Sequence, residues 1–147
     1  MDTDKQQYFL KVAHALEGCQ SVELTIKLYL STAYALAEKL IAGRMTFKMP
    51  IDDLDSKSLD RLIELFKTVN ANAALLTDLR KFKDQRNMVA HQAISKCIYP
   101  DGTFDYTTAG ELETILSSSQ IESERLVLAI HEEYNKIAVR LYFDPVC

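Results

Sequence analysis

Hydrophobic residues recur three to four positions apart along most of the chain, and this spacing predicts an all-α protein. Gly18 is expected to end the first helix and Ser21 to cap the second. Residues 70–72 fit either a break between two helices or a kink. The sequence therefore predicts one domain, 1–147, folded as an up-and-down bundle of four to five helices. The expected helical segments are 4–17, 21–42, 56–69, 71–95 and 108–142.

The stretch 97–106 interrupts the helical pattern. Its β-forming residues flank Pro100–Asp101–Gly102, in which Pro fixes φ and Gly accepts a positive φ. This arrangement predicts a small β-hairpin that leans on the bundle but is peripheral to its core. Shortly after this stretch, the sequence Thr108–Ala109–Gly110–Glu111 fits a capping box that begins the last helix.

The stretch 43–55 is expected to be a loop that leads to a third helix beginning at Ser56 or Ser58. Clustered carboxylates in this loop could bind a divalent cation, but their spacing matches no calcium-binding loop. Acids are also favoured just before a helix by the helix dipole. We therefore expect no metal site and no cofactor. The acids concerned are Asp52, Asp53 and Asp55.

The helix expected over 71–95 carries a cation inside its own hydrophobic stripe. At about 100° per residue, Arg86 lies in the middle of the apolar positions Leu75, Leu79, Phe82, Val89 and Ala93. A guanidinium keeps its charge at neutral pH, so burying it without partners is unfavourable. Arg86 is therefore expected to contact a carboxylate or water. A polar stripe lies beside it, formed by Arg80, Lys83, Asp84, Asn87 and His91.

Glu23 is the candidate partner of Arg86 within the chain. The segment 21–42 is apolar around more than half its circumference, so it should be the central helix, and Glu23 and Lys27 are its only charges before Glu38. In a second interpretation, Glu23 lies in the first turn of its helix, where the dipole favours an acid. From the sequence both interpretations stay open.

The residues Arg86–Asn87–Met88–Val89–Ala90–His91 form an Arg-x4-His motif in which an asparagine follows the arginine. In this motif, and in the stretch LTDLRKFKDQRNMVAHQAI that contains it, the chain resembles the HEPN family of helical domains. The resemblance is specific over about twenty-five residues. Elsewhere, over 19–142, it is limited to a similar helical layout.

The resemblance implies a function and a set of site residues. Catalytic HEPN proteins are dimeric, metal-independent endoribonucleases, common in toxin–antitoxin and antiviral defence systems. By this resemblance Arg86 and His91 would be catalytic, and Asn87 would orient the imidazole or contact RNA. An antitoxin or other regulatory protein is an implied partner. One feature departs from the pattern: where some members carry a tyrosine that a partner nucleotidyltransferase modifies, this chain has Ala93.

One arginine and one histidine suit RNA cleavage by the RNA's own 2′-hydroxyl. The reaction needs a base, an acid for the leaving 5′-oxygen and a cation for the phosphorane charge, but no metal. Histidine, with a pKa of about 6.5, suits either proton role, and arginine suits the phosphate. A single histidine cannot hold both roles at once. A twofold homodimer that pairs the motif helices would supply two of each residue.

Composition limits the electrostatic part of this hypothesis. The chain has 147 residues, 48% hydrophobic and 26% charged, with a formal net charge of −4. That balance argues against wholesale electrostatic binding of nucleic acid, so any phosphate contact must come from a local patch. The candidate cations are Arg80, Lys81, Lys83 and Arg86, of which Arg80 and Lys83 are the candidate substrate-binding residues. Asp84 and Glu23 are candidate supporting residues of the same site. The same run of charges is equally typical of a solvated helix face.

The cysteines and the hydrophobic runs indicate a compartment. Cys19, Cys97 and Cys147 are odd in number and widely spaced, as is typical of reduced thiols in a cytoplasmic protein. The longest uncharged run of note, 28–37, is too short to span a bilayer and does not lie at the N-terminus. We therefore expect a cytoplasmic protein with no membrane-spanning helix and no signal peptide.

Two other functional interpretations stay open. The chain could be a non-catalytic HEPN-like module that pairs with a partner protein, which its acidic balance favours. It could also be a helical protein in which Arg86 only bridges helices. A zinc site is not expected, because His131–Glu132–Glu133 does not match HExxH. His131 is expected at the surface and His14 partly buried.

Overall fold

The computed structural model describes residues 2–46 and 53–145, and the described chain is all-helical. Its four α-helices are α1 (Thr3–Ile41), α2 (Leu59–Val69), α3 (Ala73–His91) and α4 (Tyr106–Phe143), with a short 3-10 helix η1 (Leu54–Ser56) before α2. The prediction of an all-α bundle is confirmed. Within the described ranges, no helix is both long and apolar enough to cross a membrane.

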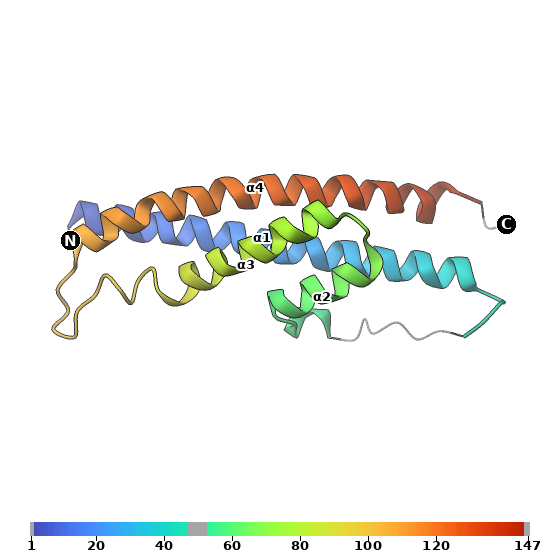
Figure 1. The fold of residues 1–147 in the computed structure, drawn as a ribbon, viewed down its shortest axis with the longest axis horizontal. Coiled ribbons are helices and arrows are strands. Elements are labelled where there is room, and N and C mark those ends of the chain that lie inside the picture. The colour runs from blue at the N-terminus through green and yellow to red at the C-terminus, as the bar shows by residue number, and fades with distance from the viewer. Residues whose placement is uncertain (1, 47–52, 146–147) are drawn as a thin grey trace.

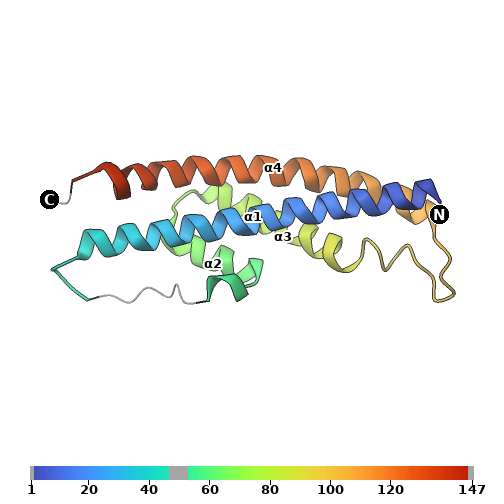
Figure 2. The same cartoon turned by 180° about the vertical axis from the view of Figure 1, so that it is seen from behind.

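Two long helices form the spine of the bundle. Helices α1 and α4 lie side by side along their whole length, and α2 and α3 cover one side of the pair (Figures 1 and 2). The pair is parallel: Lys11 meets Glu113 near one end, and Lys39 Nζ donates to the carbonyl of Leu141 near the other. Helix α2 points the same way as α1, and α3 runs back (Figure 1). The strict alternation of an up-and-down bundle is therefore not observed.

Helix α1 is continuous where two helices were predicted. Gly18 lies inside it, and a Cβ at this position would collide with the Ser123 side chain of α4. Glycine therefore serves close helix packing here, and that packing outweighs its weak helix propensity. Ser21 does not cap a helix, because its hydroxyl donates to the carbonyl of Glu17 at 3.0 Å. The predicted stop at Gly18 is wrong.

The other helix ends follow local capping. The Ser58 side chain accepts a hydrogen bond from the N–H of Arg61 and so begins α2, which agrees with one of the two predicted starts. Residues 70–72 are a true break, because Asn72 caps α3 by accepting from Leu75 N–H at 3.1 Å. Helix α3 ends at His91, before the predicted 95. Helix α4 begins at Tyr106 rather than at 108, because Asp105 is its cap.

The predicted β-hairpin is not supported. The described residues of 97–106 contain a single isolated bridge between Ile98 and Phe104, too little to form strands. The turn itself is present, since Gly102 has φ +84° and donates its N–H to the carbonyl of Tyr99. The segment is not peripheral either: Cys97 is fully buried, and the Phe104 ring packs edge-on against Tyr8 at 5.6 Å.

The buried side chains form two hydrophobic clusters instead of one core. The first joins α2 to the C-terminal half of α1, the start of α3 and the later part of α4, and its largest members include Tyr29, Phe66 and Phe82. The second, which includes Tyr8 and Val89, joins the start of α1 to the end of α3, the 93–97 segment and the start of α4. Helix α3 therefore passes from one cluster to the other between Phe82 and Val89.

The cysteines agree in part with the expected reduced state. Cys19 and Cys97 are free and buried, and they belong to different clusters. Burial raises the pKa of the Cys19 thiol. Cys147 lies outside the described residues.

Candidate functional site

The Arg-x4-His motif occupies the C-terminal end of α3, from Arg86 to His91. The helix begins at Ala73 because Asn72 caps it, and it ends at His91, where the N–H of Gln92 still donates to the carbonyl of Met88. The C-terminal end of a helix carries a partial negative charge, which favours cationic side chains in the last turns. His91 is the basic residue of that last turn, whereas Arg86 lies further inside the helix.

Arg86 is ion-paired with Glu23 of α1, as one of the two interpretations expected. Its Nε donates to Glu23 Oε1 at 3.1 Å, and the two side chains are 30% and 17% exposed. Glu23 lies in the interior of the continuous helix α1, so the first-turn interpretation is wrong. The pair is too buried to behave as an ordinary surface pair and too exposed to be a fully desolvated one.

The ion pair lies where the two hydrophobic clusters meet. Arg86 is one turn after Phe82 of the first cluster and one turn before Val89 of the second. Both charges act on the thiol of Cys19, whose pKa is raised mainly by burial. The Ser119 hydroxyl and Arg86 lower this pKa, and Glu23 raises it. A polar layer therefore separates the clusters.

His91 and Asn87 lie away from this layer. Both are exposed, whereas Arg86 reaches inward to α1. Five residues at about 100° each place His91 roughly 140° from Arg86 around the helix axis. Among the described residues, no hydrogen bond or ion pair joins the two side chains. One chain thus carries both motif residues on one helix without bringing them together.

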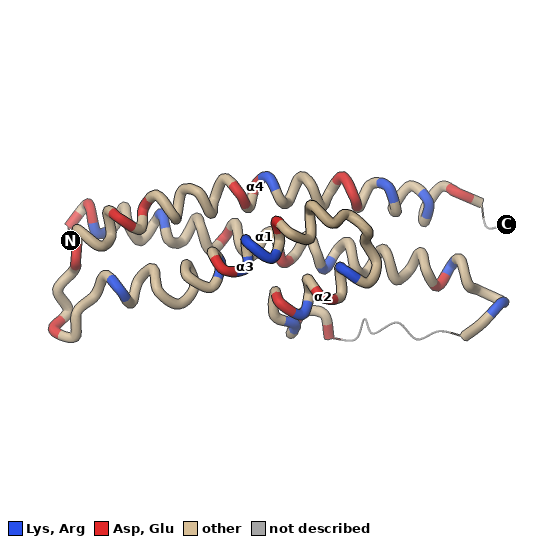
Figure 3. The backbone as a smooth tube through the Cα atoms, in the orientation of Figure 1, with Lys and Arg blue, Asp and Glu red and all other residues tan. Residues whose placement is uncertain are grey.

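The candidate phosphate-binding residues are already paired inside the chain. Lys83 Nζ lies 3.0 Å from Asp60 of α2, and this hydrogen bond raises the pKa of the Lys83 ammonium. Arg80 lies 3.9 Å from Glu64, one turn further along α2. Asp84 is exposed beside them. Figure 3 shows basic and acidic positions interspersed along the helices.

The sequence interpretation missed the partners of these cations. Asp60 and Glu64 are four residues apart on α2, and Arg80 and Lys83 are three apart on α3, so the two pairs face each other across antiparallel helices. The complementary spacing was visible in the sequence. Its meaning depends on the register of α2 against α3, which the sequence alone does not give.

The loop aspartates and the other histidines are placed as follows. Asp53 directly precedes η1 and accepts a hydrogen bond from Ser56, the last residue of η1. Asp55 lies 3.9 Å from Lys27. Asp52 lies outside the described residues. In the part of the chain that is described, no group of three or more His, Cys, Asp or Glu side chains could hold a metal ion. His131 is exposed as expected, and His14, expected partly buried, has a side chain 59% exposed.

Comparisons of the chain with models of known families, with curated proteins and with solved structures found no match.

Proposed function

We propose that this chain is a HEPN-type, metal-independent endoribonuclease that acts as a homodimer. The observation that carries the proposal is the arrangement of Arg86. Its Nε is held by Glu23, while its Nη atoms make no hydrogen bond to the described residues. A guanidinium held at one edge keeps its remaining donors for a phosphate. His91 and Asn87 are exposed on the last turn of the same helix, where a second molecule can reach them.

The chemistry follows from these groups. The 2′-oxygen of a ribose attacks the adjacent phosphorus as its proton passes to one imidazole. The bond to the 5′-oxygen then breaks, and that oxygen takes a proton from a second imidazole. The products are a 2′,3′-cyclic phosphate and a free 5′-hydroxyl. Arg86 would stabilise the negative charge on the phosphorane oxygens, which needs donors held in place before the reaction.

The need for two imidazoles supports a twofold dimer. In one chain, His91 lies roughly 140° around the helix axis from Arg86. A twofold axis that passes beside the ends of two α3 helices would bring the His91 of one copy toward the Arg86 of the other. The composite site would then contain two histidines and two arginines. A regulatory partner such as an antitoxin, and a place in a toxin or defence system, belong to the same proposal.

The test is cleavage of a single-stranded RNA in the presence of EDTA. We expect wild-type protein to produce 2′,3′-cyclic phosphate ends, and His91→Ala to lose at least about a hundredfold in rate, the usual contribution of a general acid or base. His131→Ala is the matched control, because it removes another exposed histidine from a different helix. Arg86→Lys keeps the charge but should also lose rate, since lysine cannot bind Glu23 and phosphate in the same geometry.

A second candidate function is a non-catalytic module that binds a partner protein. The ion pairs of Arg80 with Glu64 and of Lys83 with Asp60 favour it, because they neutralise the cations nearest to the motif. Carefully purified wild-type protein that cuts no RNA would support this function. His91→Ala protein that cuts RNA as fast as wild type would contradict the nuclease proposal.

A further inference from the structure

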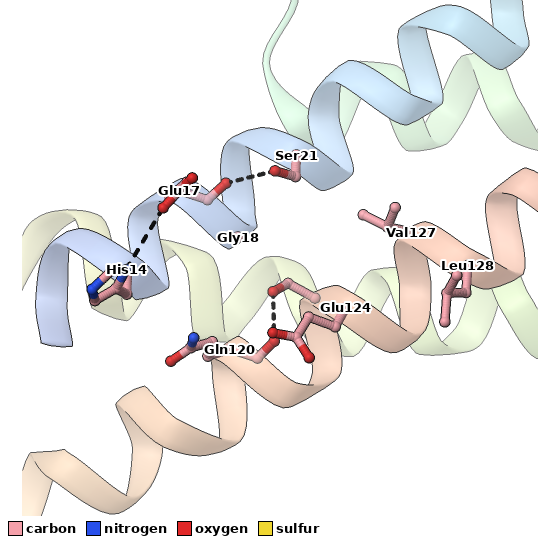
Figure 4. Close-up of a pocket in the computed structure, with 9 residues that line it drawn as sticks. His14, Glu17, Gly18, Ser21, Gln120, Glu124, Val127 and Leu128 are labelled. Atoms are coloured by element: carbon pink, nitrogen blue, oxygen red, sulfur yellow. Dashed lines mark hydrogen bonds and ion pairs between the residues drawn. The ribbon is translucent and has the colours of Figure 1, made fainter.

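A groove runs between α1 and α4 on the side away from α2 and α3. Figure 2 shows the two long helices in front of α2 and α3, so no described element covers this side. The groove has a volume of about 450 Å³ (Figure 4). Its lining residues from α1 are His14, Glu17, Gly18 and Ser21, and those from α4 are Gln120, Ser123, Glu124, Val127 and Leu128.

Large apolar side chains continue the groove along both helices. Leu128 of α4 lines the groove and is 66% exposed. On α1, Leu24 and Leu28 follow Ser21 by three and seven residues, which places them on the same helix face, and they are 62% and 44% exposed. Single exposed leucines are ordinary, but three around one groove form an apolar strip of the kind that receives a helix.

The rim of this groove is acidic. Glu17 is 76% exposed at one edge, and the His14 Nδ1 lies 3.7 Å from its carboxylate. Glu124 is exposed at the other edge. Lys11, one turn before His14, is already paired with Glu113 at 2.9 Å. The groove therefore combines an apolar strip with two exposed carboxylates, neither of which is paired with a lysine or arginine of the described residues.

These observations point to one kind of occupant. We propose that the α1–α4 groove is a docking site for a basic amphipathic helix of a partner protein. Its apolar face would cover Leu24, Leu28 and Leu128, and its lysines or arginines would meet Glu17 and Glu124. A second copy of this chain fits less well, because a twofold axis through the groove would place its carboxylates against their own copies. The site lies on the other side of the bundle from α3, so this proposal does not depend on the nuclease proposal.

A designed peptide tests the site without knowledge of the natural partner. The probe is a fluorescent peptide of Leu and Lys in a helical heptad pattern, and binding is measured by anisotropy on the full-length chain. Two control peptides separate the contributions: one replaces every Lys by Glu, and the other has the same composition in a scrambled order without an apolar face. We expect the patterned Lys peptide to bind at least about tenfold more tightly than either control.

Protein variants locate the binding. Leu128→Ser should weaken binding of the Lys peptide at least about tenfold. Glu17→Gln combined with Glu124→Gln should weaken binding of the same peptide and make that binding less dependent on salt. Ile94→Ser and Glu111→Gln remove an exposed aliphatic side chain and an exposed carboxylate outside the groove, and they should leave peptide binding unchanged. Equal binding of the scrambled or Glu peptide, no binding of the Lys peptide, or insensitivity to the groove variants would overturn the proposal. So would sedimentation showing that the groove joins two copies of the chain and that Leu128→Ser separates them.

Discussion

The part of α3 up to Arg86 and its last turn, from Asn87 to His91, differ in how their polar groups are satisfied. In the first part the cap residue Asn72 donates to Glu133 of α4 at 3.0 Å, and Arg86 binds Glu23 at 3.1 Å. Arg80 and Lys83 are also paired, with acids of α2. In the last turn, the exposed side chains of Asn87 and His91 make no hydrogen bond or ion pair with the described residues.

Along this single helix, the residues that fix its position in the fold are therefore different from the residues that are available for chemistry. Polar groups that are paired inside the chain fix where α3 lies against its neighbours. Polar groups that stay exposed at the end of α3 add little to the free-energy cost of folding, and they stay available to a second molecule. Arg86 is at the boundary, because one edge of its guanidinium is paired and the other is not. Variants of the paired residues before Arg86 should therefore mainly lower stability, variants of the exposed last turn should mainly lower activity, and variants of Arg86 should lower both.

The largest effect on stability is expected for Arg86→Ala. Removing one partner of a buried ion pair costs about 3–5 kcal/mol, and an exposed pair contributes about 0–1 kcal/mol. Since Glu23 is 17% and Arg86 30% exposed, we expect a loss of about 2–3 kcal/mol in the free energy of unfolding by urea. The half-exposed pair of Arg80 with Glu64 supplies the control, because Arg80→Ala should cost less than about 1 kcal/mol.

A double variant sharpens this result. Adding Glu23→Gln to Arg86→Ala removes the stranded carboxylate, so part of the lost stability should return. If Arg86→Ala were as stable as Arg80→Ala, the ion pair would not be what positions α3 against α1.

A smaller loss is expected for Glu133→Gln on α4, whose carboxylate binds the two asparagines that precede α3. The two carboxylate oxygens accept separately from the amides of Asn70 and Asn72, at 3.1 and 3.0 Å. Glutamine can keep only one of these bonds and turns an N–H₂ group toward the other amide, so we expect a loss of about 1–2 kcal/mol at pH 7. Glu132→Gln, at the exposed neighbouring position, is the control.

This loss should depend on pH. Burial raises the pKa of Glu133, but the hydrogen bonds from Asn72, Lys136 and Asn70 together lower it below its ordinary value of 4.5. A carboxyl group with a lowered pKa in the folded state stabilises the fold above its ordinary pKa and loses that effect as the pH falls below it. The difference between wild type and Glu133→Gln should therefore shrink below pH 4.5. A difference that stayed constant with pH would exclude the charge as its source.

The smallest effect on stability is expected for His91→Ala. The side chain is exposed at the end of α3, and substitutions at such positions usually change the free energy of unfolding by less than about 0.5 kcal/mol. Thermal melting of this variant should overlay that of wild type and of His131→Ala. A loss comparable to that of Arg86→Ala would show that His91 packs against the bundle, which would remove the contrast between the two parts of α3.

The long periodic segments made the all-α bundle predictable, and the asparagines at 70–72 marked a real break. Gly18 misled because glycine ends many helices, whereas here it lets α1 approach Ser123 of α4, a contact that is far away in sequence. The hairpin prediction for 97–106 failed because the residues of this segment favour strands, whereas in the fold Cys97 and Phe104 pack into the second cluster. Both errors come from local patterns that tertiary packing overrides.

Within the candidate site, the sequence offered Glu23 as a candidate partner of Arg86, because a buried helix carries few charges, but it did not decide between this contact and a first-turn position. The pairing of Lys83 with Asp60 could not be predicted, since it depends on how α2 lies against α3. The exposure of His91 followed from its angle around the helix. How two copies of α3 approach each other is not encoded in any local pattern of the chain.

In the proposed dimer the exposed ends of two α3 helices share one site, so the decisive measurement is the distance between these ends in the two copies. A spin label on Asn87→Cys in a Cys147→Ser background would attach at one place, because Cys19 and Cys97 are buried. Electron-spin distance measurements should give about 20 Å or less between copies, roughly two helix diameters. A label on Ser31→Cys, exposed on α1, should give a distance longer by roughly 20 Å, since a helix layer of ~10 Å is added in each copy. A monomer at micromolar concentration, or a dimer with the Asn87→Cys labels the farther apart of the two, would contradict the proposed dimer.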